Sequence, residues 1–272
     1  MKFEDMINKI HYANCLELMK DVPDNSIDLV VTSPPYDNLR DYKGYSFDFK
    51  SIAKELFRVM KKGGVVVWVV GDATINGSET GTSFRQALFF KEIGFNLHDT
   101  MIYEKGGIPY PSSNRYNQIS EYMFVFSKGK PKTYNLIKDR KNLWKGHKAH
   151  WGKPRWRQKD GEMKEIEDNH IIPEFSVRTN IWRYKIGKGN STKDEFVFKH
   201  PAIFPEKLAQ DHIISWSNEN DIVLDPMVGS GTTCKMAKLL NRKFIGIDIS
   251  QEYVELAWRR INDVPKRLDK FF

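Results

Sequence analysis

The motif that is most informative about the fold lies late in the chain and reads Asp225-Pro226-Met227-Val228-Gly229-Ser230-Gly231-Thr232-Thr233. A short apolar run, 222–224, precedes it, and a helical pattern follows over 232–240. A strand, a glycine-rich turn and a helix in this order form the ligand-binding unit of an open, parallel α/β sheet. The next apolar run, 244–247, ends at Asp248, where an acid commonly accepts hydrogen bonds from ribose hydroxyls. We therefore expect a nucleotide-like ligand at this turn.

Three ligands compete for the turn. A P-loop needs a lysine after its second glycine, where Thr232 stands, and a dinucleotide fingerprint needs a third glycine, which 229–234 lacks. S-adenosylmethionine remains, because it carries a ribose and a carboxylate but no phosphate. Gly229 and Gly231 would let the backbone approach it, and the helix start at Thr232 favours a carboxylate. The alternative is a strand–turn–helix junction without a ligand.

The alternation of strand and helix extends outward over most of the chain. The apolar runs that indicate strands are 27–31, 65–70, 222–224 and 244–247, with a late hairpin at the sheet edge from 100–103 and 122–126. The helical patterns are 51–60, 83–93, 232–240 and 251–261. Ser51 is the expected N-cap of the first helix, and a serine also begins the second. These patterns predict an α/β fold with a Rossmann-like, doubly wound, mostly parallel sheet.

Composition narrows the class of protein. The 272 residues are 40% hydrophobic and 29% charged, as in an ordinary globular protein. No apolar run approaches the roughly 20 residues of a membrane span, and the N-terminus lacks the apolar stretch of a signal peptide. Cys15 and Cys234 lie far apart and form neither a disulfide framework nor a zinc motif. We therefore expect a cytoplasmic protein without a membrane partner.

Positive charge is concentrated in the middle of the chain. Residues 132–164 contain eleven Lys or Arg and three Asp or Glu, an excess that equals the +8 net charge of the whole chain. This stretch has no clear period, and it interleaves the basic residues with tryptophans. We interpret it as an insertion that binds nucleic acid; the alternative is a solvated basic surface. His147 and His150 lack a third ligand partner, so we expect no metal.

A second motif follows the apolar run 27–31 and reads Thr32-Ser33-Pro34-Pro35-Tyr36. The two prolines stiffen the loop and remove backbone donors. The Ser33 hydroxyl and the Pro34 carbonyl could both accept hydrogen bonds from one amino group, and Tyr36 could stack on a base. A rigid turn with an exposed tyrosine is the alternative. The following residues, 37–48, include Arg40 and predict a mobile lid; the alternative is an ordinary surface loop.

Together these motifs resemble those of the DNA methyltransferases that methylate exocyclic amino groups. The matching stretches are 33–36 for motif IV, 119–128 for motif VIII, 200–206 for motif X and 225–233 for motif I. The catalytic motif precedes the cofactor motif, which is similar to the β group, where a target recognition region lies between them. The resemblance covers 11–128 and 198–261. It implies an S-adenosylmethionine methyltransferase fold with permuted motif order and an inserted recognition region.

The resemblance also assigns roles. The cofactor would be S-adenosyl-L-methionine, released as S-adenosyl-L-homocysteine. Its expected contacts are Asn14, Thr32, His200, Phe204, Asp225, Pro226, Gly229, Gly231, Thr232, Thr233 and Asp248. The expected DNA contacts are Arg40, Lys145, Lys148, Lys153, Arg155, Trp156 and Arg157. Asn14 departs from the acid that relatives often carry there. The expected parts are 1–130 for the catalytic half, 131–195 for the recognition insertion, 196–264 for the cofactor-binding half and 265–272 for a C-terminal extension.

The target base follows from the residue before Pro-Pro-Tyr. In the family a serine there, as in Ser33, favours cytosine N4, and an acid or amide favours adenine N6. Methylation of cytosine C5 needs a cysteine nucleophile, typically after a proline, and neither Cys15 nor Cys234 fits. We expect duplex DNA as partner, base flipping, and a direct in-line displacement. A cognate restriction endonuclease and a homodimer are left open. The rival functions are a DNA-binding protein with a degenerate methyltransferase fold and an RNA or protein methyltransferase.

Overall fold

The computed structural model describes residues 1–35, 47–107, 114–149, 155–165, 170–199 and 203–263. The chain divides into two compact units. We call Met1–Asn135 together with Asn180–Phe272 the core unit, and Leu136–Thr179 the insert unit. Each unit is described by itself below.

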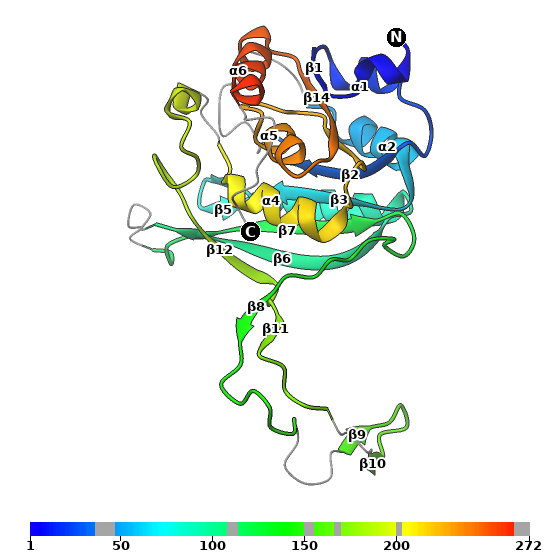
Figure 1. Ribbon diagram of the computed structural model, residues 1–272, viewed down its shortest axis with the longest axis vertical. Coiled ribbons are helices and arrows are strands. Elements are labelled where there is room, and N and C mark those ends of the chain that lie inside the picture. The colour runs from blue at the N-terminus through cyan, green and yellow to red at the C-terminus, as the bar shows by residue number, and fades with distance from the viewer. Residues whose placement is uncertain (36–46, 108–113, 150–154, 166–169, 200–202, 264–272) are drawn as a thin grey trace. The chain divides into compact units, whose positions relative to one another are not determined.

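An eight-stranded sheet in the order β1-β14-β13-β2-β3-β7-β6-β12 forms the centre of the core unit (Figure 1). Its strands are β1 (Lys9–Tyr12), β2 (Ile27–Thr32), β3 (Met60–Val70), β6 (Asn96–Gly106), β7 (Ser120–Ser127), β12 (Ile181–Lys185), β13 (Ile222–Asp225) and β14 (Lys243–Asp248). β7 runs antiparallel to both of its neighbours, and the other neighbouring strands pair in parallel. The predicted mostly parallel sheet is therefore confirmed.

We had predicted that the β6–β7 hairpin lies at the edge of the sheet, but it lies inside the sheet, between β3 and β12. β12 adds in parallel to the outer side of β6, in a register that runs from Ile181 opposite Ile102 to Lys185 opposite Gly106. Its residues alternate between exposed and buried, with Trp182 and Tyr184 inward, as in a strand with one covered face. Residues 180–195, which we expected in the insertion, thus belong to the core unit, and the insert unit is shorter than 131–195.

Helices cover both faces of the sheet. They are α1 (Cys15–Met19), α2 (Phe49–Val59), α3 (Thr82–Glu92), α4 (Glu206–Trp216), α5 (Thr232–Leu239) and α6 (Gln251–Asn262), with the 3-10 turns η1 (Phe3–Met6) and η2 (Glu195–Lys199). α2 contacts α1 and α3, whereas α5 contacts α4 and α6, so the helices form two layers. None of the helices in the described residues is long and apolar enough to cross a membrane.

Two helix starts differ from the prediction. α2 begins at Phe49, because the Asp48 side chain accepts a hydrogen bond from the Ser51 N–H at 3.2 Å and so serves as the N-cap. Ser51 lies inside the first turn. α3 begins after Gly81, whose φ of 63° is left-handed, and it has no side-chain cap. The Ser83 hydroxyl, which we took for a cap, instead bonds to Asp72 after β3.

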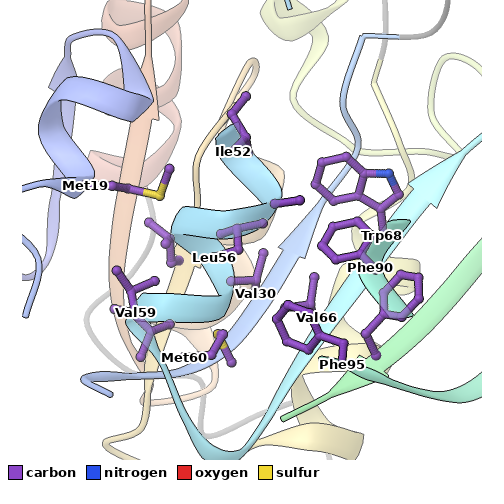
Figure 2. Packing of buried hydrophobic residues seen from close by; sticks show 14 of the residues in the cluster. Met19, Val30, Ile52, Leu56, Val59, Met60, Val66, Trp68, Phe90 and Phe95 are labelled. Carbon is purple, nitrogen blue, oxygen red and sulfur yellow. The ribbon is translucent and has the colours of Figure 1, made fainter. Parts of the chain in front are cut away.

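Apolar side chains fix the strands that carry the site. Figure 2 shows Ile52, Leu56 and Val59 of α2 beside Val30 of β2 and Val66 of β3, all of them buried. Ile52, Leu56 and Val59 recur at helical spacing. Burying side chains of this size stabilises the fold by roughly 1.5–3 kcal/mol each. This packing holds α2 against β2 and β3 in the middle of the sheet.

Aromatic side chains extend this core toward the carboxyl end of β3. Trp68 of β3 donates its indole N–H to the Gln86 side chain of α3 at 2.8 Å. Phe90 lies with its ring centroid 5.2 Å from Trp68 and 4.5 Å from Phe126 of β7. These contacts join α3 to both strands. Because β2 pairs with β3, its last residues are held in a fixed position at the carboxyl ends of the strands.

The remaining strands are short two-stranded ribbons. β4 (Thr74–Ile75) pairs with β5 (Ser78–Glu79) in the core unit. In the insert unit, β8 (Lys138–Lys141) pairs with β11 (Phe175–Val177), and β9 (Arg155–Arg157) pairs with β10 (Met163–Glu165), both antiparallel. Most of the residues in these four strands are exposed.

Candidate active site

The carboxyl ends of three adjacent strands bring the two sequence motifs together. β13 pairs in parallel with β2 on one side and with β14 on the other. Thr32, Asp225 and Asp248 therefore end neighbouring strands at one edge of the sheet, where α/β proteins bind their ligands. The Thr32 hydroxyl donates to a carboxylate oxygen of Asp225 at 2.7 Å, across 193 residues of sequence. This bond joins the loop that follows β2, which we call the Ser33 loop, to residues 226–231 between β13 and α5, which we call the cofactor turn.

Asp225 is a buried acid held by several donors. Besides the Thr32 hydroxyl, the Met227 N–H donates to it at 3.2 Å, and the Thr233 side chain favours its ionised form. Burial raises the pKa of Asp225 to about 6, although these donors oppose the rise, and the nearby charge of Asp248 adds to it. At neutral pH the carboxyl is therefore mostly ionised, yet close to protonation.

Asp248 ends β14 with part of its carboxylate still able to accept. One oxygen accepts from the Gly229 N–H at 2.8 Å and the other from the Ser250 N–H at 2.9 Å. Burial raises its pKa, and the three backbone donors near it oppose this. An ionised carboxylate has about four acceptor positions, so these three donors leave about one for a ribose hydroxyl.

The turn between β13 and α5 requires its second glycine for packing. Gly231 has a φ of 82°, and a Cβ atom there would lie 2.8 Å from the Cβ of Ala257 in α6. We had expected both glycines to admit a ligand; at Gly231 the observed constraint is the neighbouring helix. α5 then begins at Thr232 without a side-chain cap. The backbone N–H groups of its first turn suit a carboxylate.

The two threonine hydroxyls of this turn bond to protein groups. Thr232 accepts from Arg260 at 2.8 Å, and Thr233 donates to the carbonyl of Val31 at 3.0 Å. These contacts fix the start of α5 against α6 and β2. What Thr232 and Thr233 can offer a ligand is therefore chiefly their backbone N–H groups.

The Ser33 loop, which we expect to be catalytic, begins directly after β2. Pro34 is buried, while Ser33 and Pro35 are half-buried. Ser33 follows Thr32, whose hydroxyl contacts Asp225, so the loop starts beside the cofactor turn. Tyr36, which we expect to stack on the base, lies outside the described residues, as does Arg40.

The other expected cofactor contacts surround this edge only in part. The Asn14 side chain caps α1 by accepting from the Leu16 N–H at 2.8 Å, and the Ala13 N–H donates to the Asp248 carbonyl at 3.0 Å. Asn14 is therefore next to the end of β14. Pro226 is buried and Phe204 is half-buried, while His200 lies outside the described residues.

Neither cysteine is suited to nucleophilic attack. Burial raises the pKa of Cys15 to about 11 and that of Cys234 well above its ordinary value. Both side chains are therefore neutral thiols at physiological pH, and the thiolate is the reactive form. This agrees with a reaction that involves no covalent bond to the base.

Comparison with known proteins identifies the family. Residues 27–259 match the family of DNA methylases that act on N6 or N4 amino groups. This chain belongs to that family. The resemblance inferred from the sequence motifs is therefore confirmed, and so is the fold class.

Individual relatives agree with this assignment. The orphan methyltransferase M.BamHII of Bacillus amyloliquefaciens is 61% identical over 246 residues, which cover 90% of this chain and 92% of the relative. The type II methyltransferase M.BglII of Bacillus subtilis is 28% identical, covering 97% of this chain and 72% of that protein.

Solved structures share the fold of this methylase. The cytosine-N4-specific PvuII DNA methyltransferase has a TM-score of 0.67 at 24% identity, covering 94% of this chain and 88% of that one. M1.HpyAVI, solved as a complex with SAM, has a TM-score of 0.61 at 25% identity, covering 93% and 98%.

In the insert unit the expected DNA contacts are exposed. They are Lys145, Lys148, Arg155, Trp156 and Arg157, and Lys153 lies outside the described residues. Lys145 pairs with Glu174 at 2.5 Å and Arg155 with Glu165 at 3.0 Å. Exposed pairs of this kind contribute little, so phosphates can replace the carboxylates. The described residues contain no group of three His, Cys, Asp or Glu that could hold a metal ion.

Sequence reasoning missed one functional candidate, Arg260. Its side chain is buried behind the cofactor turn, where it bonds to Ser230 and Thr232. A signal was present, because Arg260 lies three residues after Ala257 and next to Ile261, both on the buried side of α6. A charged residue in that register predicts a buried ion pair.

Proposed function

We propose that this methylase transfers a methyl group from S-adenosyl-L-methionine to the exocyclic N4 of cytosine in duplex DNA. The observation that carries the proposal is the hydrogen bond between Thr32 and Asp225. It joins the first residue of the catalytic motif to the first residue of the cofactor motif. A base amino group held by Ser33 would therefore lie next to the cofactor.

The residues around the cofactor turn fit S-adenosyl-L-methionine. Asp248 offers an acceptor to the ribose, and the uncapped start of α5 offers N–H donors to the carboxylate. M1.HpyAVI, which shares the fold, was solved with this cofactor. We propose that Asn14, His200 and Phe204 complete the pocket. When bound, the cofactor supplies an electrophilic methyl group on its sulfonium and is released as S-adenosyl-L-homocysteine.

The loop residues would make the base amino group nucleophilic. The lone pair of that nitrogen is delocalised into the ring and reacts poorly. The Ser33 oxygen and the Pro34 carbonyl would accept its two N–H bonds and favour a tetrahedral nitrogen, whose lone pair then points at the methyl group. Once methylated, the nitrogen would release its surplus proton to water. Positioning and electrostatics supply most of the rate in such a site.

Ser33 also favours cytosine over adenine. Family members with an acid or amide at this position lean toward adenine N6, whereas serine leans toward cytosine N4. The PvuII enzyme is named cytosine-N4-specific, but at 24% identity its likeness concerns the fold alone. The proposal therefore depends on Ser33, and N6-methyladenine is the outcome that would replace it.

We propose duplex DNA in the cytoplasm as the partner, held by the insert unit. On the β9–β10 ribbon, Trp156 is paired with Lys164 and is 63% exposed between Arg155 and Arg157. Exposed cations contact phosphates, and an exposed tryptophan can stack on an unpaired base. The target cytosine must leave the helix to reach Ser33. M.BamHII is called an orphan methyltransferase, and we propose no endonuclease partner.

Methyl transfer from labelled cofactor to duplex DNA tests the catalytic roles. Ser33→Ala and Tyr36→Ala should lower kcat on the order of 100-fold, because each loses a group that contacts the base. Ser26→Ala, at the opposite end of β2, and Tyr134→Ala, at an exposed position, are the matched controls. Full activity in both loop variants would overturn the assignment.

Two further measurements separate the rival functions. A degenerate methyltransferase fold should not bind S-adenosyl-L-methionine, so calorimetry with the cofactor alone distinguishes it from an enzyme. An RNA methyltransferase should lose its DNA activity when RNA competes, whereas we expect duplex DNA to outcompete RNA of the same sequence.

A further inference from the structure

Four charged side chains gather next to the cofactor turn, where one of them bonds to Ser230 and Thr232. They are Asp194, Glu206, Lys235 and Arg260, which we call the buried charge cluster. The Arg260 side chain is 0% exposed and that of Lys235 is 13% exposed. Two cations and two anions balance, as burial of charge requires.

Arg260 directs its three nitrogens to two segments of the chain. Nε donates to Asp194 at 2.8 Å, and one terminal nitrogen donates to Glu206 at 2.6 Å. The other, Nη1, donates to the Thr232 hydroxyl at 2.8 Å and to the Ser230 carbonyl at 3.2 Å. A planar guanidinium can bond to both carboxylates and to the turn at once, and a lysine ammonium in its place has neither that reach nor that geometry.

The two carboxylates in turn hold both ends of segment 191–206. Glu206 accepts from the Thr192 hydroxyl at 2.7 Å, and its N–H donates to the Ser191 carbonyl at 2.9 Å. The Asp194 N–H donates to the Thr192 hydroxyl at 3.1 Å. This segment includes Phe204, which is half-buried and which we propose as a contact of the methionine part of the cofactor. The cluster therefore joins the two sides of the proposed pocket.

Stability alone does not account for the cluster. Moving charges out of water is costly, and replacing a buried ion pair by apolar side chains is often neutral or stabilising. Burial opposes ionisation of Asp194, but the hydrogen bonds from Lys235 and Arg260 outweigh it and lower the pKa. What the cluster provides, and apolar packing does not, is a fixed geometry between the turn and segment 191–206.

We propose that Arg260 is a positioning residue that sets the affinity of the methylase for its cofactor. It holds the cofactor turn, through Ser230 and Thr232, in register with segment 191–206, through Asp194 and Glu206. Arg260 does not contact the reacting atoms. The inference rests on the proposed binding of S-adenosyl-L-methionine at this turn.

The test compares Arg260→Lys with Lys235→Gln by calorimetry with S-adenosyl-L-methionine. Lys235 bonds to the same two carboxylates, but no bond from it to Ser230 or Thr232 is found among the described residues. Both variants should lower the melting temperature. Only Arg260→Lys should raise the cofactor Kd, by about tenfold, the loss of roughly one charge-assisted hydrogen bond. At saturating cofactor its kcat should stay within a few-fold of the wild type.

Each outcome decides the proposal. An unchanged Kd in Arg260→Lys, or an equal rise in both variants, would reduce the cluster to a structural role. Absence of cofactor binding by the wild type would overturn the proposed function as well, so the two failures are distinguishable. If Arg260→Lys does not fold, Thr232→Val takes its place, since it removes an acceptor of Arg260 and keeps the shape of the side chain. Its Kd should then rise, and an unchanged Kd would contradict the proposal.

Discussion

Asp225 contacts both the strand end that leads into the Ser33 loop and the cofactor turn. Its carboxylate accepts from Thr32 on one side and from Met227 on the other, inside the protein. Because the side chain is buried, its pKa is raised to about 6, whereas an exposed aspartate titrates near 4. The folded state therefore binds this proton more tightly than the unfolded chain does.

The raised pKa gives a stability that depends on pH. Between pH ~4 and ~6 the folded state holds more protons, so the free energy of unfolding should fall as pH rises. Asp225→Asn removes this dependence, and its stability relative to wild type should increase by roughly 2 kcal/mol from pH 4 to pH 7. Urea unfolding at several pH values measures this. Asp5→Asn, at an exposed position, is the control for the loss of one carboxylate. A curve for Asp225→Asn that runs parallel to the wild type would contradict the raised pKa of Asp225.

Single residues were predictable where a motif fixes their place. Asp225 and Asp248 end apolar runs, so the sequence places them at one edge of a parallel sheet. The partners of the threonine hydroxyls were not predictable, because Thr232 bonds to Arg260 of α6, which is 28 residues away. Contacts of this kind depend on how a later helix packs, which no local pattern encodes.

At the scale of elements, the turn before α5 depends on its contact with α6. Gly231→Ala should destabilise the fold by more than about 2 kcal/mol, because the added Cβ meets Ala257 at 2.8 Å and the φ of 82° is strained for alanine. Gly77→Ala is the matched control, since its φ is 77° and a Cβ there meets nothing within 4 Å. Chemical denaturation of both variants separates strain from contact. An equal loss of unfolding free energy in both variants would mean that α6 moves to make room for the added side chain.

Strands and helices of the core unit followed from apolar runs and helical spacing, and errors arose at their ends. The first turn of α2 contains Ser51, but Asp48 reaches the N–H groups and takes the cap. β12 was hidden because Trp182 and Tyr184 alternate with exposed residues inside a basic stretch. A strand that is covered on one face only gives a weak signal next to fully buried ones.

At the scale of the whole molecule, the chain divides into the core unit and the insert unit. The order of motifs predicted an insertion between the catalytic and cofactor halves, and charge located it near 132–164. Its limits, Leu136–Thr179, depend on which residues join the sheet and which do not. Asn135 illustrates this, because its side chain donates to the Ile214 and Ser217 carbonyls at the end of α4.

DNA binding through the insert unit should depend on salt. The logarithm of the association constant for DNA should fall steeply with the logarithm of the salt concentration. Arg157→Gln should reduce the size of this slope by about one if Arg157 neutralises one phosphate. Lys243→Gln is the control, because Lys243 is exposed at the amino end of β14, away from the proposed site. Fluorescence anisotropy over a salt series measures both. An unchanged slope in Arg157→Gln would remove that residue from the interface.

Mass spectrometry of nucleosides tests the proposed reaction most directly. Duplex DNA is incubated with the methylase and S-adenosyl-L-methionine, digested to nucleosides and compared with DNA treated with Ser33→Ala. We expect N4-methylcytosine in the first sample and little in the second. N6-methyladenine without N4-methylcytosine would contradict the choice of base that Ser33 supports, and no methylated nucleoside at all would contradict the function.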